Sequence, residues 1–240
     1  MEELKNKTVL ITGSSSGIGH ATAAMLLDRG YDVIGLSRHF EKDDPILSHE
    51  NFRPMICDVT SKSLSDTMKK IRARYRVDYL ILNAGVAYYG NHETLDEGEM
   101  EEIIDTDLLA PLIITKCFLP GLKAKGGRII FISSETAIMN GSPKAAAYGA
   151  AKAGLLHFAR SIALEAKNTA LKVTTIIPDL TSTDLYRNAD FIPDRKSGSS
   201  LDPFDVARAV ISALEAGDDI VFPEIRISPA HPRIEKKTLR

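Results

Sequence analysis

The chain alternates short, largely apolar runs with longer amphipathic ones. Six of the short runs have the length and the β-branched content of strands buried on both faces of a sheet, and "DIVF" (219–222) is a possible seventh. The six are "KTVLIT" (7–12), "YDVIGLS" (31–37), "FRPMIC" (52–57), "VDYLILN" (77–83), "GRIIFIS" (127–133) and "LKVTTIIP" (171–178). No repeat or low-complexity linker divides the pattern, so it predicts one domain over residues 1–240.

The segments between these runs carry the helical spacing of apolar residues, and several have recognisable ends. They span 19–30, 61–75, about 96–122, 146–168 and 202–217. Gly30 closes the first, serines can cap the second, and the last has Asp202 at its N-cap, Pro203 at N1 and Gly217 past its end. Strand, helix and strand in succession predict an α/β fold, a Rossmann-like doubly wound parallel sheet of about seven strands with helices on both faces. Ligands of such sheets bind outside the carboxyl ends of the strands.

Composition narrows the class of protein. Hydrophobic residues make up 44% of the chain and charged residues 26%, with a formal charge of −2, so a nucleic-acid partner is not expected. Cys57 and Cys117 lie in apolar stretches, which indicates buried thiols in a reducing compartment, and their spacing is not that of a metal site. The polar start, and the lack of a run of about 18 apolar residues, predict a cytoplasmic protein with no membrane partner.

A glycine-rich turn, "TGSSSGIG" (12–19), follows the first strand directly and opens the first helix. Gly13, Gly17 and Gly19 would allow a tight turn and a close approach of the backbone to a pyrophosphate, whose charge is favoured at a helix N-terminus. Three residues rather than one separate the first two glycines, so the spacing is not that of the usual dinucleotide fingerprint. A merely flexible turn is the alternative, but the position between strand and helix favours a dinucleotide site.

The end of the second strand, "GLSRH", bears on which dinucleotide binds. Ser37 stands where NAD-binding folds place an acidic residue on the ribose hydroxyl, and Arg38 offers a planar guanidinium to a 2′-phosphate. The pair therefore predicts NADP(H). Alternatively, Asp43 and Asp44 draw the Arg38 side chain away as an ordinary surface ion pair.

The stretch "SSETAIMNGSPKAAAYGAAK" (133–152) brings together the residue types of a proton-transfer site. Tyr148 and Lys152 share a helix face one turn apart, while Ser133 and Ser134 end the fifth strand on the ligand-binding edge. We expect the Lys152 ammonium, together with an oxidised nicotinamide ring, to lower the pKa of Tyr148, and we expect Ser134 to hold the substrate oxygen. In the direction of reduction, Tyr148 donates its proton to the carbonyl oxygen as hydride arrives from the reduced cofactor. Taken alone, the motif reads as a core-facing tyrosine beside a solvated lysine; the glycine turn and the sheet favour catalysis.

Together these motifs resemble the single-domain short-chain dehydrogenase/reductase family over roughly residues 5–222. "TGSSSGIG", "LNAG" and "YGAAK" are similar to its main motifs, and "CDVT" and "PDLTSTD" to its adenine and nicotinamide contacts. The resemblance implies Ser134, Tyr148, Lys152 and Asp107 as catalytic residues and a small carbonyl or alcohol substrate. It implies cofactor contacts at Gly13, Ser15, Ser16, Gly17, Ile18, Gly19, Ser37, Arg38, Asp58, Val59, Asn83, Ala84, Gly85, Tyr148, Lys152, Pro178, Thr181 and Thr183.

One departure from the family pattern touches the catalytic residues directly. Asp107 stands where the family usually has an asparagine that completes a proton relay. If only the backbone carbonyl of Asp107 acts, the change is harmless. If its carboxylate points at Lys152, it partly offsets the positive charge acting on Tyr148.

Other departures concern loops. Asp179 replaces a glycine after Pro178 and adds negative charge near the cofactor, and Ala137 replaces a glycine after the serines. Ser134 lies fourteen residues before Tyr148, one more than the family's usual spacing, so the choice between the two serines stays open. The tail, 223–240, lacks the family's Gly-Gly ending and is basic.

The sequence therefore predicts an NADP-dependent oxidoreductase that interconverts an alcohol and a carbonyl. Residues 179–200, which include Tyr186, Arg187, Phe191 and Arg195, should form a mobile lid that selects the substrate. Tyr88 and Tyr89 either border the substrate or are ordinary loop residues.

Partners and rival functions follow from the same resemblance. The helices at 96–122 and 146–168 resemble those that pair between subunits in the family, which implies a homodimer or homotetramer. One alternative function is a non-catalytic NADP-binding sensor or scaffold, which would bind the dinucleotide without turnover. Another, an epimerase or dehydratase of the extended branch, is disfavoured by the glycine spacing and by the lack of a larger substrate domain.

Overall fold

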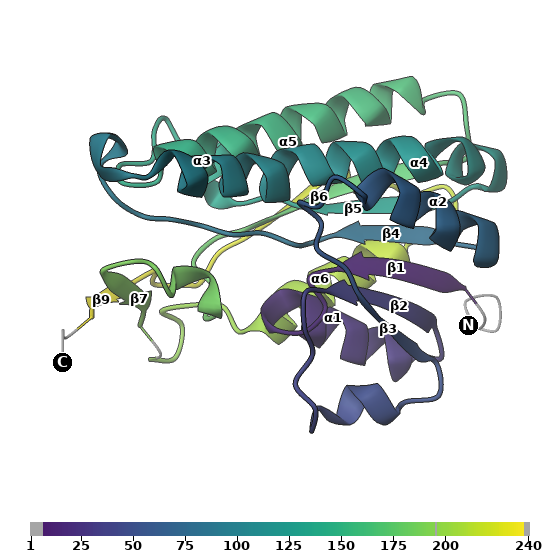
Figure 1. The fold of residues 1–240 in the computed structure, drawn as a ribbon, viewed down its shortest axis with the longest axis horizontal. Helices are drawn as coiled ribbons and strands as arrows, with labels where there is room; N and C mark the ends of the chain where they lie inside the picture. The colour runs from purple at the N-terminus through teal and green to yellow at the C-terminus, as the bar shows by residue number, and fades with distance from the viewer. Residues whose placement is uncertain (1–6, 195, 238–240) are drawn as a thin grey trace.

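A computed structural model describes residues 7–194 and 196–237 and contains a seven-stranded sheet in which every neighbouring pair is parallel. The strand order is β3-β2-β1-β4-β5-β6-β8 (Figure 1). The strands are β1 (Thr8–Thr12), β2 (Asp32–Ser37), β3 (Phe52–Ile56), β4 (Tyr79–Leu82), β5 (Arg128–Ile132), β6 (Lys172–Pro178) and β8 (Glu224–Ile227). The order reverses between β1 and β4, which is the switch point where such sheets open a crevice for ligands. The predicted doubly wound fold is confirmed.

Helices cover both faces of this sheet. They are α1 (Gly17–Leu27), α2 (Leu64–Arg74), α3 (Glu97–Ile104), α4 (Ala110–Lys125), α5 (Ala146–Glu165) and α6 (Pro203–Leu214). Figure 1 shows α1 and α6 on one face and α2 to α5 on the other. The predicted start of α6 is confirmed, since Asp202 accepts a hydrogen bond from the backbone N–H of Phe204 as its N-cap.

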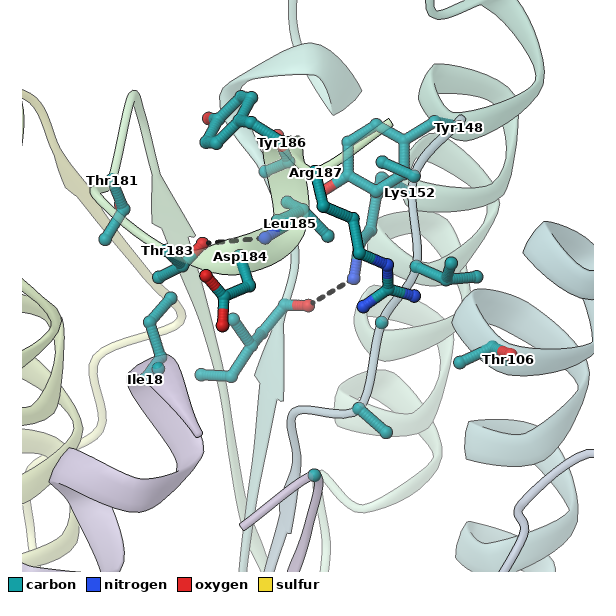
Figure 2. Close-up of a pocket in the computed structure, with 18 of the residues that line it drawn as sticks. Ile18, Thr106, Tyr148, Lys152, Thr181, Thr183, Asp184, Leu185, Tyr186 and Arg187 are labelled. Carbon is teal, nitrogen blue, oxygen red and sulfur yellow. Dashed lines mark hydrogen bonds between the residues drawn. The ribbon is translucent and has the colours of Figure 1, made fainter. Parts of the chain in front are cut away.

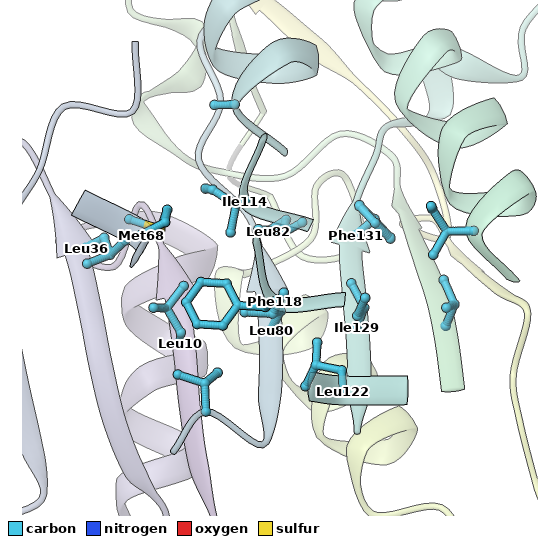
Figure 3. Packing of buried hydrophobic residues seen from close by; sticks show 14 of the residues in the cluster. Leu10, Leu36, Met68, Leu80, Leu82, Ile114, Phe118, Leu122, Ile129 and Phe131 are labelled. Carbon is cyan, nitrogen blue, oxygen red and sulfur yellow. The ribbon is translucent and has the colours of Figure 1, made fainter. Parts of the chain in front are cut away.

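The two faces have separate hydrophobic cores because successive strand residues point to opposite sides. In β1, Leu10 packs with Met68, Phe118 and Phe131 under α2, α4 and α5 (Figure 3). Its neighbours Val9 and Ile11 belong to the other core, with α1 and α6. Strands β1, β4 and β5 are buried along nearly their whole length, so their carboxyl ends are held rigidly where a site can be built.

Three sequence expectations need correction. The seventh strand is Glu224–Ile227, whereas 219–222 lies in a turn and an exposed segment. Strand Glu224–Ile227 alternates charged and apolar residues, as a half-exposed edge strand does. It therefore lacks the wholly apolar run that is typical of a strand buried on both faces. The opposite edge strand, β3, is likewise exposed at Ile56 rather than buried on both faces. Cys57 is buried as expected, but Cys117 is only partly buried.

The long helix expected over about 96–122 is interrupted. Between α3 and α4 the chain makes a π-helical turn, Asp105–Leu109, in which the N–H of Ala110 donates to the carbonyl of Asp105 five residues earlier. A π-helical turn carries one extra residue and rotates the side chains that follow, and such turns are frequent at functional sites. Here the turn carries Asp107, whose side chain is fully buried.

Beyond the carboxyl ends of the main sheet, the predicted substrate loop (179–200) pairs with the C-terminal tail. Strand β7 (Phe191–Pro193) and strand β9 (Ile234–Lys236) form an antiparallel ribbon, visible in Figure 1 at the end of the molecule away from the N-terminus. Lys237 adds two hydrogen bonds of 2.8 Å from its ammonium to the carbonyls of Tyr186 and Arg187. The tail thus contacts the loop directly; Arg195 and residues 238–240 lie outside the described residues.

Two further findings limit the kinds of site. Within residues 7–194 and 196–237, no helix is long and apolar enough to cross a membrane. Over the same described ranges, no three His, Cys, Asp or Glu side chains gather as a metal site.

Candidate active site

A cavity of about 650 Å³ opens at the carboxyl ends of the central strands, between the glycine turn and the substrate loop. Nearly all of the predicted site residues line it. Those on the cavity wall are Gly13, Ser15, Ser16, Gly17, Ile18, Ser37, Arg38, Asp58, Val59, Asn83, Ala84, Gly85, Ser134, Tyr148, Lys152, Pro178, Thr181 and Thr183. Gly19 and Asp107 do not line the cavity, but each contacts residues that do: Gly19 packs against Gly13, and Asp107 pairs with Lys152.

The glycine turn is held by backbone bonds and by the end of β4. Gly13 has φ 68°, which favours glycine, and its N–H donates to the carbonyl of Leu36 at 2.7 Å. The Asn83 side chain donates to the carbonyls of Thr12 and Gly13 at 3.0 and 3.1 Å. A Cβ on Gly19 would lie 2.0 Å from the Gly13 carbonyl oxygen, so only glycine fits. The turn therefore brings the start of α1 close to the cavity with its first N–H groups free of side-chain caps.

At the end of β2, Arg38 lies on the cavity, but the acid that holds it is not the one considered from the sequence. The Ser37 hydroxyl accepts from the N–H of Ser15 at 3.0 Å, which ties β2 to the glycine turn. Arg38 is half exposed and pairs with Glu102 of α3, with 3.1 Å between Nη1 and Oε1. Asp44, one of the two acids considered as its partner, instead contacts His20 at 3.0 Å. Arg38 thus lies at the cavity, held by an acid that is distant in the sequence.

At the other end of the cavity, Lys152 is buried and fixed on two sides. Its ammonium donates to the carbonyl of Ile132 at 3.0 Å and pairs with the Asp107 carboxylate at 2.9 Å. The second Asp107 oxygen accepts from the N–H of Val86 at 2.9 Å. Of the two alternatives left by the sequence, the structure shows the carboxylate, and not only the backbone of Asp107, acting on the lysine. Burial raises the pKa of Asp107, and Lys152 and the Val86 N–H oppose that rise.

Tyr148 projects from α5 beside Lys152, whose ammonium lies 5.7 Å from the centre of the phenol ring (Figure 2). Burial raises the pKa of Tyr148 well above its usual range, and the neighbouring Tyr89, Asp107 and Tyr186 add to the rise. Hydrogen bonding with Ser134 opposes it. Among the protein's own groups, Lys152 does not produce the expected lowering of this pKa, chiefly because the phenol is buried, and the Asp107 charge beside Lys152 adds to the rise. The phenol therefore carries its proton.

The two serines have different surroundings. Ser133 is buried, and its hydroxyl donates to the backbone carbonyl of Lys152 at 3.2 Å, so it fastens α5 to the end of β5. Ser134 is the serine that interacts with the Tyr148 hydroxyl, and its own oxygen accepts from the N–H of Thr136 at 3.2 Å. Ala137 lies in a short 3₁₀ turn, Glu135–Ala137, without a positive φ, so no glycine is needed there.

The segment after β6 crosses the mouth of the cavity. Asp179 has no positive φ, and its carboxylate accepts from the N–H of Leu180 at 2.7 Å, which explains why an aspartate is accommodated. Thr183 accepts from the N–H of Leu185 at 3.3 Å and caps a 3₁₀ turn, Asp184–Tyr186 (Figure 2). A Cβ on Gly17 would lie 3.2 Å from the methyl carbon of Thr183, so glycine keeps this end of the crevice open.

Aromatic rings form the wall next to Tyr148. Tyr89 is stacked on Tyr186, with 5.8 Å between ring centres, and meets Phe191 edge-on at 5.2 Å. The sequence left open whether Tyr88 and Tyr89 border the pocket; Tyr89 lines the cavity, while Tyr88 donates to Glu102 at 2.6 Å. The wall also includes residues that the sequence did not indicate, among them Glu102, Ile234 and Lys236. Ile234 and Lys236 lie in the tail, beyond the last motif, so no local signal marks them.

Comparison with known proteins gives a consistent result. The family model for short chain dehydrogenases matches residues 7–190. The 3-oxoacyl-[acyl-carrier-protein] reductase of Vibrio harveyi is 32% identical over 219 residues, 87% of this chain and 89% of that protein. An alcohol dehydrogenase from the archaeon Thermococcus sibiricus, solved with 5-hydroxy-NADP, superposes with a TM-score of 0.85 at 26% identity and covers 95% of this chain and 99% of its own. The Thermoplasma acidophilum aldohexose dehydrogenase superposes with a TM-score of 0.79 at 26% identity, and the match covers 95% of this chain and 94% of that one.

Proposed function

This chain belongs to the short-chain dehydrogenase family and is an NAD(P)-dependent oxidoreductase, and we propose that it uses NADP(H) to interconvert a carbonyl and an alcohol through Tyr148, Lys152 and Ser134. One observation carries the proposal. The Tyr148 phenol lies beside both the Ser134 hydroxyl and the Lys152 ammonium, on the wall of a cavity that reaches the glycine turn.

The residues at the other end of the cavity fit a dinucleotide. The start of α1 offers free N–H groups to a pyrophosphate. Glycine at position 13 lets the turn pack closely on the end of β4, since a Cβ there would come within 2.9 Å of Ala84. Arg38 would hold a 2′-phosphate, and Asp58 and Val59 would border the adenine. Thr181 and Thr183, which line the same cavity, would hold the nicotinamide amide. NADP(H) in relatives of solved structure supports the choice.

The chain's own groups suit the reduction of a carbonyl. When bound, the reduced dinucleotide supplies hydride to the carbonyl carbon. Tyr148 donates its proton to the carbonyl oxygen, and the raised pKa of Tyr148 keeps that proton available at neutral pH. Ser134 holds the same oxygen in place. Lys152, fixed by Ile132 and Asp107, places a positive charge beside the phenolate that forms.

The first test is NADPH oxidation, with NADH in parallel, against a panel of aldehydes, ketones and 3-oxoacyl thioesters. The wild type should turn over at least one carbonyl faster with NADPH, and Tyr148→Phe should lose roughly 100-fold or more of that rate, as expected when a general acid is removed. The variant should still bind NADPH. Equal rates for the two proteins would contradict the role of Tyr148.

The rival function gives a different result in the same assay. A sensor or scaffold would bind NADPH tightly and turn over none of the panel. The buried Asp107–Lys152 pair is the observation that keeps this rival in view, because it takes up part of the lysine's charge. Turnover that depends on Tyr148 would exclude it.

We also propose a cytoplasmic homodimer or homotetramer that pairs through α4 and α5, with no nucleic-acid or membrane partner. Exposed apolar residues at Leu109 and Leu164, at 44% and 74% exposure, support a covered surface on this side of the molecule. Light scattering that finds only a 26 kDa species would contradict the oligomer.

A further inference from the structure

Arg38 is not free in this structure, and the group that holds it comes from across the cavity. Its Nη1 lies 3.1 Å from Oε1 of Glu102 on α3. The other carboxylate oxygen, Oε2, accepts from the Tyr88 hydroxyl at 2.6 Å. Hydrogen bonding to Glu102 raises the pKa of Tyr88, so this donor stays protonated. Both oxygens of one carboxylate are therefore engaged by side chains that follow two different strands, β2 and β4.

This cluster lies on the cavity. Arg38 and Glu102 both line it, with 54% and 29% of their side chains exposed. An ion pair so accessible to water is weak, so a stronger ligand can displace it. A phosphate dianion is such a ligand for arginine, because it matches the guanidinium fork in charge and shape.

Resting on the proposed use of NADP(H), we propose that Glu102 is a specificity-determining residue that competes with the 2′-phosphate for Arg38. The Glu102 carboxylate holds the guanidinium when the phosphate is absent, and it must give it up when the phosphate binds. Tyr88 keeps the carboxylate in position for this exchange. Glu102 thereby weakens the preference for a 2′-phosphorylated dinucleotide and leaves the binding of the unphosphorylated one unchanged.

Calorimetric titration of the full chain measures this without any substrate or turnover. The probes are adenosine 2′,5′-bisphosphate and 5′-AMP, which differ only in the 2′-phosphate. Glu102→Gln should bind the bisphosphate roughly threefold to tenfold more tightly than the wild type does, and 5′-AMP equally well. Tyr88→Phe should shift the bisphosphate in the same direction by a smaller factor.

Matched variants separate competition from a general change of charge. Glu101→Gln removes the same charge from the neighbouring, exposed position of α3 and should leave both affinities within twofold. In an Arg38→Ala background, Glu102→Gln should change the bisphosphate affinity by less than twofold. A full-sized effect in that background would overturn the proposal, since Glu102 would then act by repulsion alone.

The outcomes also distinguish this inference from the proposed function. A wild type that prefers the bisphosphate, with no gain in Glu102→Gln, overturns the role of Glu102 and leaves the use of NADP(H) intact. If the wild type binds the two probes equally and Glu102→Gln prefers the bisphosphate, the competition is supported. No preference in either protein overturns both.

Discussion

Asp107 sets the charge around the candidate catalytic tyrosine. It is fully buried, pairs with Lys152 at 2.9 Å, and is one of the groups that raise the pKa of Tyr148. Only glycine at position 85 leaves room for the pair, because a Cβ there would lie 2.8 Å from Asp107 Oδ1 and 3.4 Å from Lys152 Nζ. Gly85, which follows β4, thus leaves the space that the Asp107 carboxylate of the π-helical turn occupies.

Asp107→Asn should therefore shift the pH dependence of the reaction. With the negative charge gone, the pKa of Tyr148 falls, and alcohol oxidation, which needs the deprotonated phenol, should begin at lower pH. Carbonyl reduction, which needs the protonated phenol, should likewise lose rate at a lower pH than in the wild type. The measurement is kcat/KM against pH in both directions.

The neighbouring carboxylate provides the control for Asp107. Asp105→Asn, in the same π-helical turn, removes a charge that is not among those acting on Tyr148 and should leave the profile in place. Identical profiles for Asp107→Asn and the wild type would show that Asp107 does not act on the phenol.

The site residues that could be predicted from the sequence are those that lie in short motifs. The glycines, Tyr148 and Lys152 could be found because their spacing alone places them on one turn or one helix face. The partner of Arg38 could not, since Glu102 is 64 residues away and meets it only through the fold. The direction of the Tyr148 pKa could not be predicted for the same reason, since it depends on burial of the phenol and on Tyr89, Asp107 and Tyr186, which the fold brings close.

At the scale of elements, the C-terminal tail forms part of the substrate end of the cavity. Strand β9 pairs with β7, Lys237 holds the carbonyls of Tyr186 and Arg187, and Ile234 and Lys236 line the cavity. The loop that was expected to be a mobile lid is therefore tied to the tail in this structure. The tail orders the aromatic wall of Tyr89, Tyr186 and Phe191.

A chain that ends at Ala230, and so lacks β9, should lose this order while keeping the cofactor end. We expect kcat/KM for the carbonyl to fall by roughly tenfold or more, because a displaced wall no longer orients the substrate. NADPH affinity, measured by titration, should change by less than twofold. Lys237→Met, which keeps the strand, should give an intermediate loss, and Lys167→Met, in the exposed turn after α5, should give none. Loss of NADPH affinity in the truncated chain would contradict the separation of the two ends.

The elements predicted well are those whose pattern is local. Six strands and the starts of most helices follow from apolar runs and capping residues. The π-helical turn did not follow, since nothing in "IIDTDLLAPL" departs from helical spacing and the extra residue is accommodated by packing. The ribbon of β7 and β9 was missed because two three-residue strands more than forty residues apart carry too little pattern to be paired from sequence.

For the whole molecule, the order of the strands decides where the cofactor can bind. The reversal between β1 and β4 opens the crevice, and the cavity there is lined from the ends of β1, β2, β4, β5 and β6. The alternation of strands and helices was enough to predict this edge. The substrate was not predictable, since relatives with the same fold include an acyl-carrier-protein reductase, an alcohol dehydrogenase and an aldohexose dehydrogenase.

A ligand held by so many strand ends should stabilise the molecule as a unit. At a free NADPH concentration 100 times its dissociation constant, binding adds about 2.7 kcal/mol to the free energy of unfolding. For a chain of this size that corresponds to a rise in Tm of about 5 to 10 °C, measurable by calorimetry. NADH at the same concentration should raise Tm less, because it lacks the phosphate for Arg38.

Arg38→Ala tests whether this difference arises at the predicted place. The variant should show equal, smaller shifts with NADPH and NADH, while its Tm without ligand stays within a few degrees, since an exposed pair with Glu102 contributes about 1 kcal/mol or less. An undiminished advantage of NADPH in Arg38→Ala would mean that another cation binds the 2′-phosphate. Arg187, which lines the same cavity, would then be the residue to change next.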